Sequence, residues 1–84
     1  MPEPTIGRIV HYTLPEGRSK GDVRPAIIVH VWGPEHDSSV QLQVFTDESN
    51  DGLPGVVWKT SVALSTTGES EFGRYHWPKV PARA

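Results

Sequence analysis

The sequence contains no cysteine. This absence excludes disulfide bonds and the common thiolate zinc sites, which are two of the usual means of stabilising a short chain. The 84 residues predict a single domain over residues 1–84, because hydrophobic cores divide only in much longer chains. One small core gives modest stability, so self-association is the remaining way to add to it. We therefore expect a homo-oligomer.

Long apolar runs and an excess of basic residues are also missing. No run approaches the ~20 apolar residues of a membrane helix, and the first six residues lack the basic and apolar regions of a signal peptide. Eight Lys and Arg against ten Asp and Glu give a net charge of −2. This charge disfavours nucleic-acid binding, because it provides no field that attracts a phosphate backbone. The composition predicts a soluble protein without membrane contact.

Helical periodicity is absent from the whole chain, and short β-like runs separated by Gly, Pro, Asn and Asp take its place. We expect strands at residues 6–12, 26–32, 40–45, 56–64 and 72–78. Their spacing predicts an all-β fold, a small five-stranded antiparallel barrel or strongly bent sheet of the SH3-like kind. An OB-type barrel is the alternative, but residues 46–55 cannot supply its usual helix. Residues 1–5 and 79–84 are expected to be flexible.

The longest apolar run, Arg24–Trp32, is predicted to be the central strand, with Pro25 at its start. Strict alternation assigns one side of each strand to the core. The predicted core sets are Ile27, Val29 and Val31; Val40, Leu42 and Val44; and Val56, Trp58, Thr60, Val62 and Leu64. The opposite side of the central strand receives Ala26, Ile28, His30 and Trp32. In an antiparallel hairpin, His30 and Trp32 would join Gln41, Gln43 and Phe45 in a polar and aromatic patch.

Catalytic and metal-binding signatures are not found. There is no G-x-S-x-G elbow, and the four histidines lack the paired spacing of zinc motifs. Residues 47–52 have the D-x-S-x-D-G spacing that opens an EF-hand loop, but its twelfth position is Trp58 and its flanks are strands. We expect no catalytic residue, no metal and no cofactor.

Aromatic and arginine residues suggest a binding role instead. Aromatic rings stack on nucleobases, guanidinium groups bind phosphate, and amides and hydroxyls add hydrogen bonds. The candidate ligand-binding residues are Arg8, Arg24, Trp32, Phe45, Asn50, Thr60, Ser61, Arg74, Tyr75 and Trp77. The same residue types are enriched at subunit interfaces, so a ligand face and an interface both remain open. A site between subunits would satisfy both.

Several short motifs extend over most of the chain. They are the segments 7–12 (GRIVHY), 24–29 (RPAIIV), 31–33 (VWG), 42–47 (LQVFTD), 50–52 (NDG), 58–62 (WKTSV) and 75–78 (YHWP). In these motifs the chain resembles a group of small uncharacterised proteins encoded by tailed bacteriophages and prophages. The resemblance implies an accessory protein in the cytoplasm of a bacterial host cell. Oligomeric proteins that sequester nucleotide signals of host immunity belong to that context.

The expected function is therefore a non-enzymatic, oligomeric sponge for a small nucleotide-like ligand, acting against host defence. The alternative is a virion structural component or an inhibitor of a host protein. An SH3-like nucleic-acid binder is less favoured because of the net charge.

Overall fold

The computed structural model describes residues 3–78 and places all strands in one antiparallel sheet. The strands are β1 (Ile9–Thr13), β2 (Val23–Val31), β3 (Val40–Phe45), β4 (Val56–Val62) and β5 (Tyr75–His76), in the spatial order β4-β3-β2-β1-β5. No α-helix occurs in the described part of the chain. A 3-10 turn at Glu48–Asn50, which the sequence did not predict, is its one helical element. The all-β prediction is confirmed.

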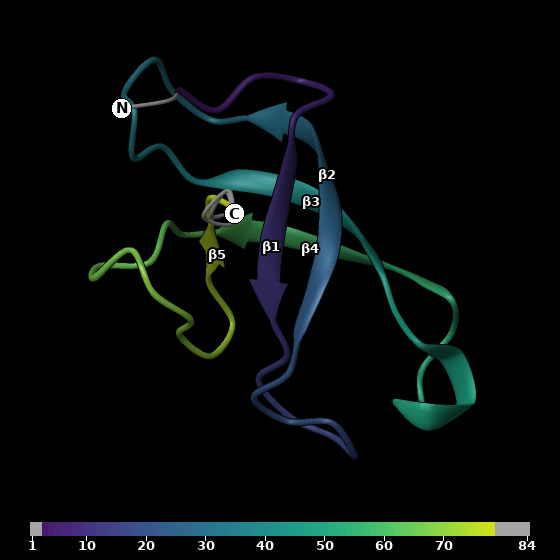
Figure 1. Ribbon diagram of the computed structural model, residues 1–84. Coiled ribbons are helices and arrows are strands. Elements are labelled where there is room, and N and C mark those ends of the chain that lie inside the picture. Colours follow the sequence, from purple (N-terminus) through teal and green to yellow (C-terminus); the bar gives the residue numbers. More distant parts are fainter. Residues whose placement is uncertain (1–2, 79–84) are drawn as a thin grey trace, which may run out of the picture.

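The sheet is strongly bent. In Figure 1, β2 curves along its length, and β1 crosses β3 and β4 at a steep angle. The sheet order ends with β4 on one side and β5 on the other. Directly after β4, the Tyr75 N–H donates to the Ala63 carbonyl at 3.1 Å, and the Ser65 N–H donates to the Tyr75 carbonyl at 2.8 Å. This isolated parallel bridge between Leu64 and Tyr75 links the segment after β4 to β5.

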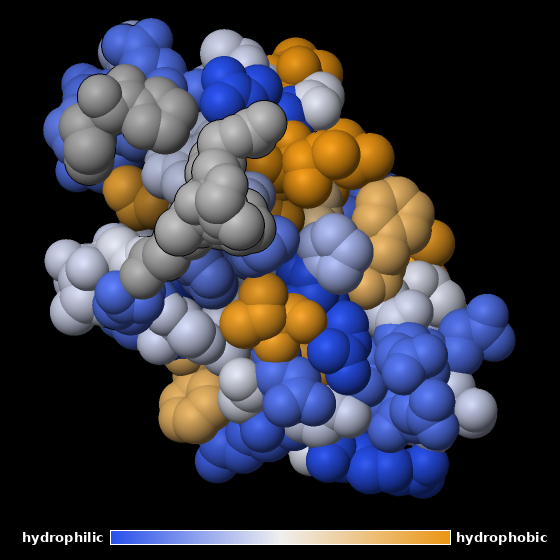
Figure 2. All heavy atoms as spheres, in the orientation of Figure 1, coloured by the Kyte–Doolittle hydropathy of each residue, from blue (hydrophilic) through white to orange (hydrophobic). Residues whose placement is uncertain are grey.

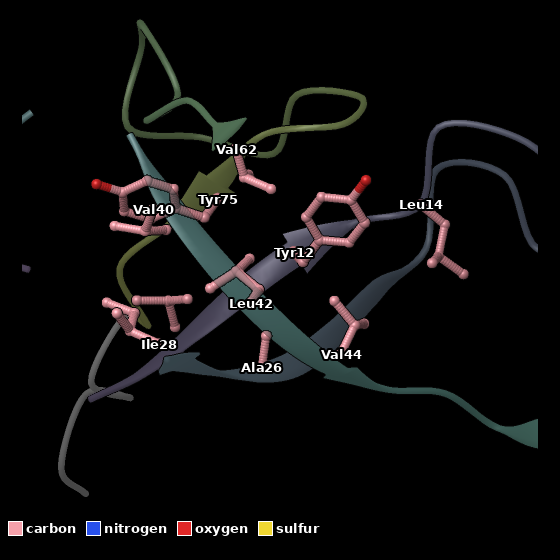
Figure 3. Packing of buried hydrophobic residues seen from close by; sticks show 10 residues of the cluster. Tyr12, Leu14, Ala26, Ile28, Val40, Leu42, Val44, Val62 and Tyr75 are labelled. Carbon is pink, nitrogen blue, oxygen red and sulfur yellow. The ribbon is translucent and has the colours of Figure 1, made fainter. Parts of the chain in front are cut away.

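The core fills the concave inner side of the bent sheet (Figure 3). It draws side chains from every strand and from the segment after β1. Its buried members are Val10, Tyr12, Leu14, Ala26, Ile28, Val40, Leu42, Val44, Val62 and Tyr75. The prediction for β3 is confirmed, since Val40, Leu42 and Val44 are all fully buried. Burying each such side chain contributes about 1.5–3 kcal/mol to the free energy of unfolding.

The prediction of which β2 side chains point into the core is wrong for the first part of the strand. Ala26 and Ile28 are fully buried, whereas Val29 is 39% exposed. The pairing runs from Ile28 opposite Leu42 to His30 opposite Gln41, which leaves Val29 as the extra residue of a β-bulge. A bulge shifts the alternation by one residue, so residues on either side of it cannot follow one two-residue period. Val31 packs against the core as predicted because it lies beyond the bulge.

The same error affects β4. Val56 and Trp58 are 49% and 53% exposed, and Thr60 is exposed as well. A register shift opposite Val40 and Leu42 lets Val62 turn inward, and Ser61 has φ +53° at this point. The prediction that Trp58 belongs to the core is therefore wrong, and the prediction for Val62 is confirmed. Both irregularities lie next to Gln41 of β3.

Pro25 lies inside β2 and not at its start, because the strand begins at Val23. The Ile28 N–H donates to the Arg8 carbonyl at 2.9 Å, so even-numbered N–H groups of β2 point toward β1. The nitrogen of Pro25 therefore faces β3, where pairing begins only at Ala26. Its missing N–H costs no ladder hydrogen bond.

The predicted flexible ends lie mostly outside the described residues. Of residues 1–5, Pro4 is buried, whereas residues 1–2 and 79–84 are not described. Over residues 3–78, no helix is long and apolar enough to cross a membrane.

Candidate functional site

The convex side of the sheet carries the predicted polar and aromatic patch. We call this side the outer face. One row of the outer face crosses four strands through the paired residues Ile9, Ile27, Gln43 and Trp58. In Figure 2, apolar side chains gather beside β2 and the start of β1, whereas the loops at the lower end are hydrophilic. His30, Trp32, Gln41, Gln43 and Phe45 share this side, as predicted, and Val56, Trp58 and Thr60 join them.

Large apolar side chains on the outer face are accessible to solvent. Trp32 is 58% exposed, Phe45 40% and Ile9 57%. The His30 and Trp32 rings meet edge to face, with centroids 4.4 Å apart. The Thr60 hydroxyl donates to the Gln41 side-chain carbonyl. The outer face therefore exposes more large apolar and aromatic side chains than is usual for a surface that contacts only water.

A second surface lies beside β5. It is an open cleft of about 850 Å³. We call it the β5 cleft. Its lining combines hydroxyl, imidazole, guanidinium and indole groups, from His36, Asp37, Ala63, Leu64, Ser65, Thr66, Thr67, Gly68, Arg74, His76, Trp77 and Pro78.

Trp77 links the β5 cleft to the neighbouring arginine and tyrosine. The Arg8 guanidinium carbon lies 5.1 Å from the centre of the Trp77 ring, within cation–π range. The Tyr75 ring meets Trp77 edge to face at 6.2 Å. The indole Nε1–H of Trp77 is buried and has no hydrogen-bond partner among the residues that the structure describes. A buried unpaired donor costs free energy, which an acceptor at this position would recover.

The loop from Ser65 to Glu71 borders the same cleft and is organised around one carboxylate. The Glu71 carboxylate accepts hydrogen bonds from the Ser65 hydroxyl at 2.8 Å, from the Thr66 hydroxyl at 2.9 Å, and from the hydroxyl and N–H of Thr67 at 2.8 and 2.9 Å. These hydrogen bonds, led by that of Ser65, lower the pKa of Glu71 to about 2. Glu71 is therefore ionised at neutral pH and held inside its own loop.

Arg74 is only loosely neutralised by that carboxylate. Its Nε lies 3.8 Å from Glu71 Oε1, and its Nη1 donates to the Leu64 carbonyl at 3.1 Å. The Arg74 side chain is 41% exposed. Because Arg74 is partly exposed and its contact with Glu71 is long, part of its guanidinium is available to an anion in the cleft.

Arg24 has a different environment, and the structure does not place it for ligand binding. Its guanidinium forms a two-point ion pair with the buried Asp51, with Nε–Oδ2 at 2.8 Å and Nη2–Oδ1 at 2.6 Å. The Asp47 N–H also donates to Asp51 Oδ2 at 2.7 Å. These hydrogen bonds, led by that of Arg24, hold the pKa of the Asp51 carboxyl well below its usual range. Arg24 is therefore occupied by an internal carboxylate.

The Arg24 pair involves one carboxylate of residues 47–52, whose spacing is that of the first half of an EF-hand calcium loop. Its last carboxylate, Asp51, is turned toward Arg24. Among residues 3–78, no group of three or more His, Cys, Asp and Glu side chains is arranged to hold a metal ion.

Tyr75 is a core residue and does not offer its ring for stacking. It is fully buried, and its hydroxyl donates to the Ser38 carbonyl at 2.7 Å. Burial raises the pKa of Tyr75 to about 12. Asn50 lies in the 3-10 turn, where its side chain donates to Asp47 at 3.0 Å. Ser61 is the positive-φ residue of the β4 bulge.

The structure thus separates the predicted ligand residues into several places. Trp32, Phe45 and Thr60 lie on the outer face, and Arg74 and Trp77 line the β5 cleft with Arg8 against the indole. The hydroxyl cluster around Glu71 was missed, although a Ser-Thr-Thr run is a recognised source of side-chain hydrogen bonds to nearby backbone. A single chain does not bring all the predicted residues into one site.

A second concavity is small and largely apolar. It measures about 260 Å³ and lies between the segment 14–17 and the inner sides of β3 and β4. It falls below the ~300–1,000 Å³ of sites for drug-sized ligands.

Comparison with known proteins assigns no family. A Serpin-Z2B from Oryza sativa subsp. japonica is 37% identical over 68 residues, which is 81% of this chain. The chain spans 16% of the length of that protein. No protein-family model matches the chain, and no solved structure matches it.

Proposed function

We propose that this protein is a non-enzymatic binding module that holds a small, anionic, nucleotide-like ligand in the β5 cleft. The observation that carries the proposal is Arg74, a partly exposed and loosely paired cation on the wall of a cleft of about 850 Å³. This volume lies within the ~300–1,000 Å³ of clefts that bind small molecules.

The groups around Arg74 match the parts of such a ligand. Arg74 meets a phosphate by charge-assisted hydrogen bonds, and the ring of His36 lies on the same lining. Trp77 contributes an aromatic surface and an indole N–H that lacks a partner in the described chain. A bound acceptor would pair this donor, which favours the liganded state.

The biological setting of the proposal comes from the resemblance to small phage proteins. In that setting the module sequesters a nucleotide signal of host immunity in the bacterial cytoplasm and does not alter it chemically. An SH3-like fold is part of this proposal. The strand order β4-β3-β2-β1-β5 and the bridge between Leu64 and Tyr75 support it, because together they bring the two edges of the bent sheet together at one point.

Titration calorimetry with a panel of cyclic and linear nucleotides tests the proposal. We expect binding by at least one member, a loss of affinity of about tenfold or more in Arg74→Gln, and partial retention in Arg74→Lys. Lys20→Gln is the matched control, since it removes one positive charge from the side chain beside Phe72, away from the cleft lining. Denaturation should release the ligand intact.

Three results would overturn this proposal. Absence of heat with every nucleotide would exclude the ligand class, and recovery of a cleaved product would make the protein an enzyme. An equal loss of affinity in Lys20→Gln and Arg74→Gln would show that general surface charge, and not the β5 cleft, attracts the ligand.

A protein-interaction role is the second candidate, and the outer face favours it. Ile9, Trp32 and Phe45 are each at least 40% exposed on one side of the sheet. Such a surface suits a virion component or an inhibitor of a host protein. Mass spectrometry of purified phage particles would find the protein if it is a virion component, whereas a soluble ligand sponge would be absent.

A further inference from the structure

We infer that the free edge of β4 pairs with the same edge of a second copy, antiparallel and across a twofold axis. The inference concerns the partner of the sheet edge and does not depend on the ligand of the β5 cleft. It rests on four observations: the direction of the backbone groups, the lack of edge protection, the position of Trp58 and the charges at the two ends of the pairing.

The hydrogen bonds of the adjoining hairpin show which backbone groups of β4 are directed outward. The Thr46 N–H donates to the Gly55 carbonyl at 2.9 Å. In an antiparallel pair the direction of these groups alternates along the strand, so Gly55, Val57 and Lys59 face β3. The N–H and C=O groups of Val56, Trp58 and Thr60 therefore point away from it. Among residues 3–78, β4 has one neighbouring strand in the sheet, which is β3.

Over residues 56–60 this edge has few of the features that usually prevent strand pairing. Natural edge strands are protected by proline, by charged or inward-pointing side chains, by bulges, by short length or by a covering segment. The bulge of β4 lies at Ser61, beyond residues 56–60. β4 contains no proline and has one charged residue, Lys59, which lies opposite the buried Leu42 on the inner side. The segment after β4 is covered by Tyr75 through the bridge at Leu64. Residues 56–60 are left as an extended, mostly uncharged edge.

The alternation fixes the best register for a symmetric pair. Outward-directed residues must lie opposite each other, and the register centred on Trp58 is the one that pairs all three of them, Trp58 with Trp58 of the second copy and Val56 with Thr60. The two indoles then lie side by side on the outer face, where each is now 53% exposed. The row Ile9, Ile27, Gln43 and Trp58 continues without interruption into the second copy. Cross-strand aromatic pairs of this kind stabilise sheets.

The charges favour a second copy as the occupant. In this register Lys59 lies opposite Val57 of the other copy, diagonal to its Gly55. The carboxylate of Glu48 lies next to Gly55, since a Cβ added there would be 3.2 Å from Glu48 Oε2. Lys59 of each copy therefore approaches Glu48 of the other, and symmetry makes this pair twice. Within the described chain, neither residue belongs to an ion pair.

Sedimentation equilibrium across a range of protein concentrations tests the inference, with Trp58→Lys as the first variant. Two like charges side by side at the axis should weaken the dimer by about 100-fold or more. Ile9→Lys is the matched control, because Ile9 is equally exposed on the outer face but lies in β1, three strands away. It should leave the dimer within about threefold of the wild type.

A second pair of variants isolates the backbone contribution. Val56→Pro removes an outward N–H without removing a bond to β3, and it should weaken the dimer by about tenfold. Val56→Thr keeps that N–H and should behave as the wild type. Circular dichroism of each variant checks that the sheet is intact.

Amide hydrogen exchange reports directly on the edge. In the dimer, the N–H groups of Val56, Trp58 and Thr60 should exchange more slowly as the protein concentration rises, while those of other exposed positions should not change. A protein that remains monomeric at all concentrations would overturn the inference. So would a dimer that Ile9→Lys dissociates and Trp58→Lys does not, since that result would indicate face-to-face packing of the sheets.

Discussion

The loops 46–55 and 65–71 are each built around one carboxylate, but the two carboxylates have different kinds of partner. Asp51 pairs with the guanidinium of Arg24, which comes from β2. Glu71 accepts hydrogen bonds from hydroxyl groups of its own loop, those of Ser65, Thr66 and Thr67. One carboxylate therefore joins segments that are distant in the sequence, and the other shapes a local turn.

The long-range role of Asp51 is strengthened by its neighbours. Arg18 donates to the Ser49 carbonyl at 2.6 Å, and the Ser19 hydroxyl donates to the Asn50 carbonyl at 3.3 Å. The loop after β1 and the loop after β3 are thus held together at one end of the sheet. The loop around Glu71 instead borders the β5 cleft. Asp51 therefore supports the fold, whereas Glu71 supports the shape of the proposed site.

The largest effect is expected for Asp51→Asn. This change removes the two-point partner of the Arg24 guanidinium, whose side chain is only 19% exposed, and leaves it only the longer contact with Asp22 at 3.7 Å. Breaking such a pair by removing one member is strongly destabilising. We expect the melting temperature to fall by about 10 °C or more, because a domain of this size loses several degrees per kcal/mol. Thermal unfolding followed by circular dichroism measures the change.

Asp47→Asn is the matched control for that variant. Asp47 lies in the same loop and is exposed, and its side chain accepts one bond, from Asn50. Its melting temperature should stay within about 2 °C of the wild type. Equal losses in the two variants would show that loss of negative charge from the loop, and not the Arg24 pair, determines stability.

The next largest effect is a loss of stability at low pH. The pKa values of Asp51 and Glu71 are both lower in the folded protein than their ordinary values, so the unfolded chain binds more protons than the folded chain in acid. The stabilisation is complete above the ordinary values and is lost as the pH falls. For Glu71 this window runs from its ordinary 4.5 down to about 2. Urea unfolding at several pH values should show stability falling throughout this window.

The two carboxylates can be separated in the same experiment. Glu71→Gln should make the decline between pH 4.5 and 2 shallower, and the part contributed by Asp51 should continue to lower pH. A decline of unchanged steepness in Glu71→Gln would mean that its hydroxyl partners do not favour the ionised form.

The alternation of β3 was sufficient to predict its buried residues, but the facing of β2 and β4 was not predictable in the same way. Val40, Leu42 and Val44 are buried because β3 contains no extra residue. The bulges at Val29 and Ser61 shift the alternation of the neighbouring strands. Nothing in a Val or Ser residue marks a bulge, since its position is set by pairing with another strand. Trp58 was consequently assigned to the core although it lies on the outer face.

The residue types of the candidate site were predictable from the sequence, but which of these residues lie together was not. Aromatic and arginine residues indicated binding, and the structure places Arg74 and Trp77 along one cleft. The pairing of Arg24 with Asp51 could not be predicted, because it depends on contact between β2 and a loop 27 positions away. The sequence within each loop does not contain that information.

A smaller effect is expected for Glu71→Gln at neutral pH. The amide keeps the shape of the side chain but loses the charge that four donors recognise, so the melting temperature should fall by about 5 °C. Loss of this negative charge beside Arg74 should also strengthen binding of an anionic ligand in the β5 cleft. Differential scanning calorimetry and nucleotide titration measure the two effects. Weaker binding with an intact fold would place the ligand elsewhere.

The smallest effects should come from single hydroxyl groups around Glu71, and they can rank the local contacts. The Ser65 hydroxyl is shared between Glu71 and the Glu69 carbonyl, and Ser65 is only 6% exposed. Thr66 is exposed, and water can replace its hydroxyl. Ser65→Ala should therefore lower the melting temperature by about 4 °C and Thr66→Val by about 1 °C, measured by thermal unfolding at neutral pH. Equal shifts would mean that the two hydroxyl groups contribute equally to the stability of the turn around Glu71. The burial of Ser65 would then add nothing to the strength of its hydrogen bond.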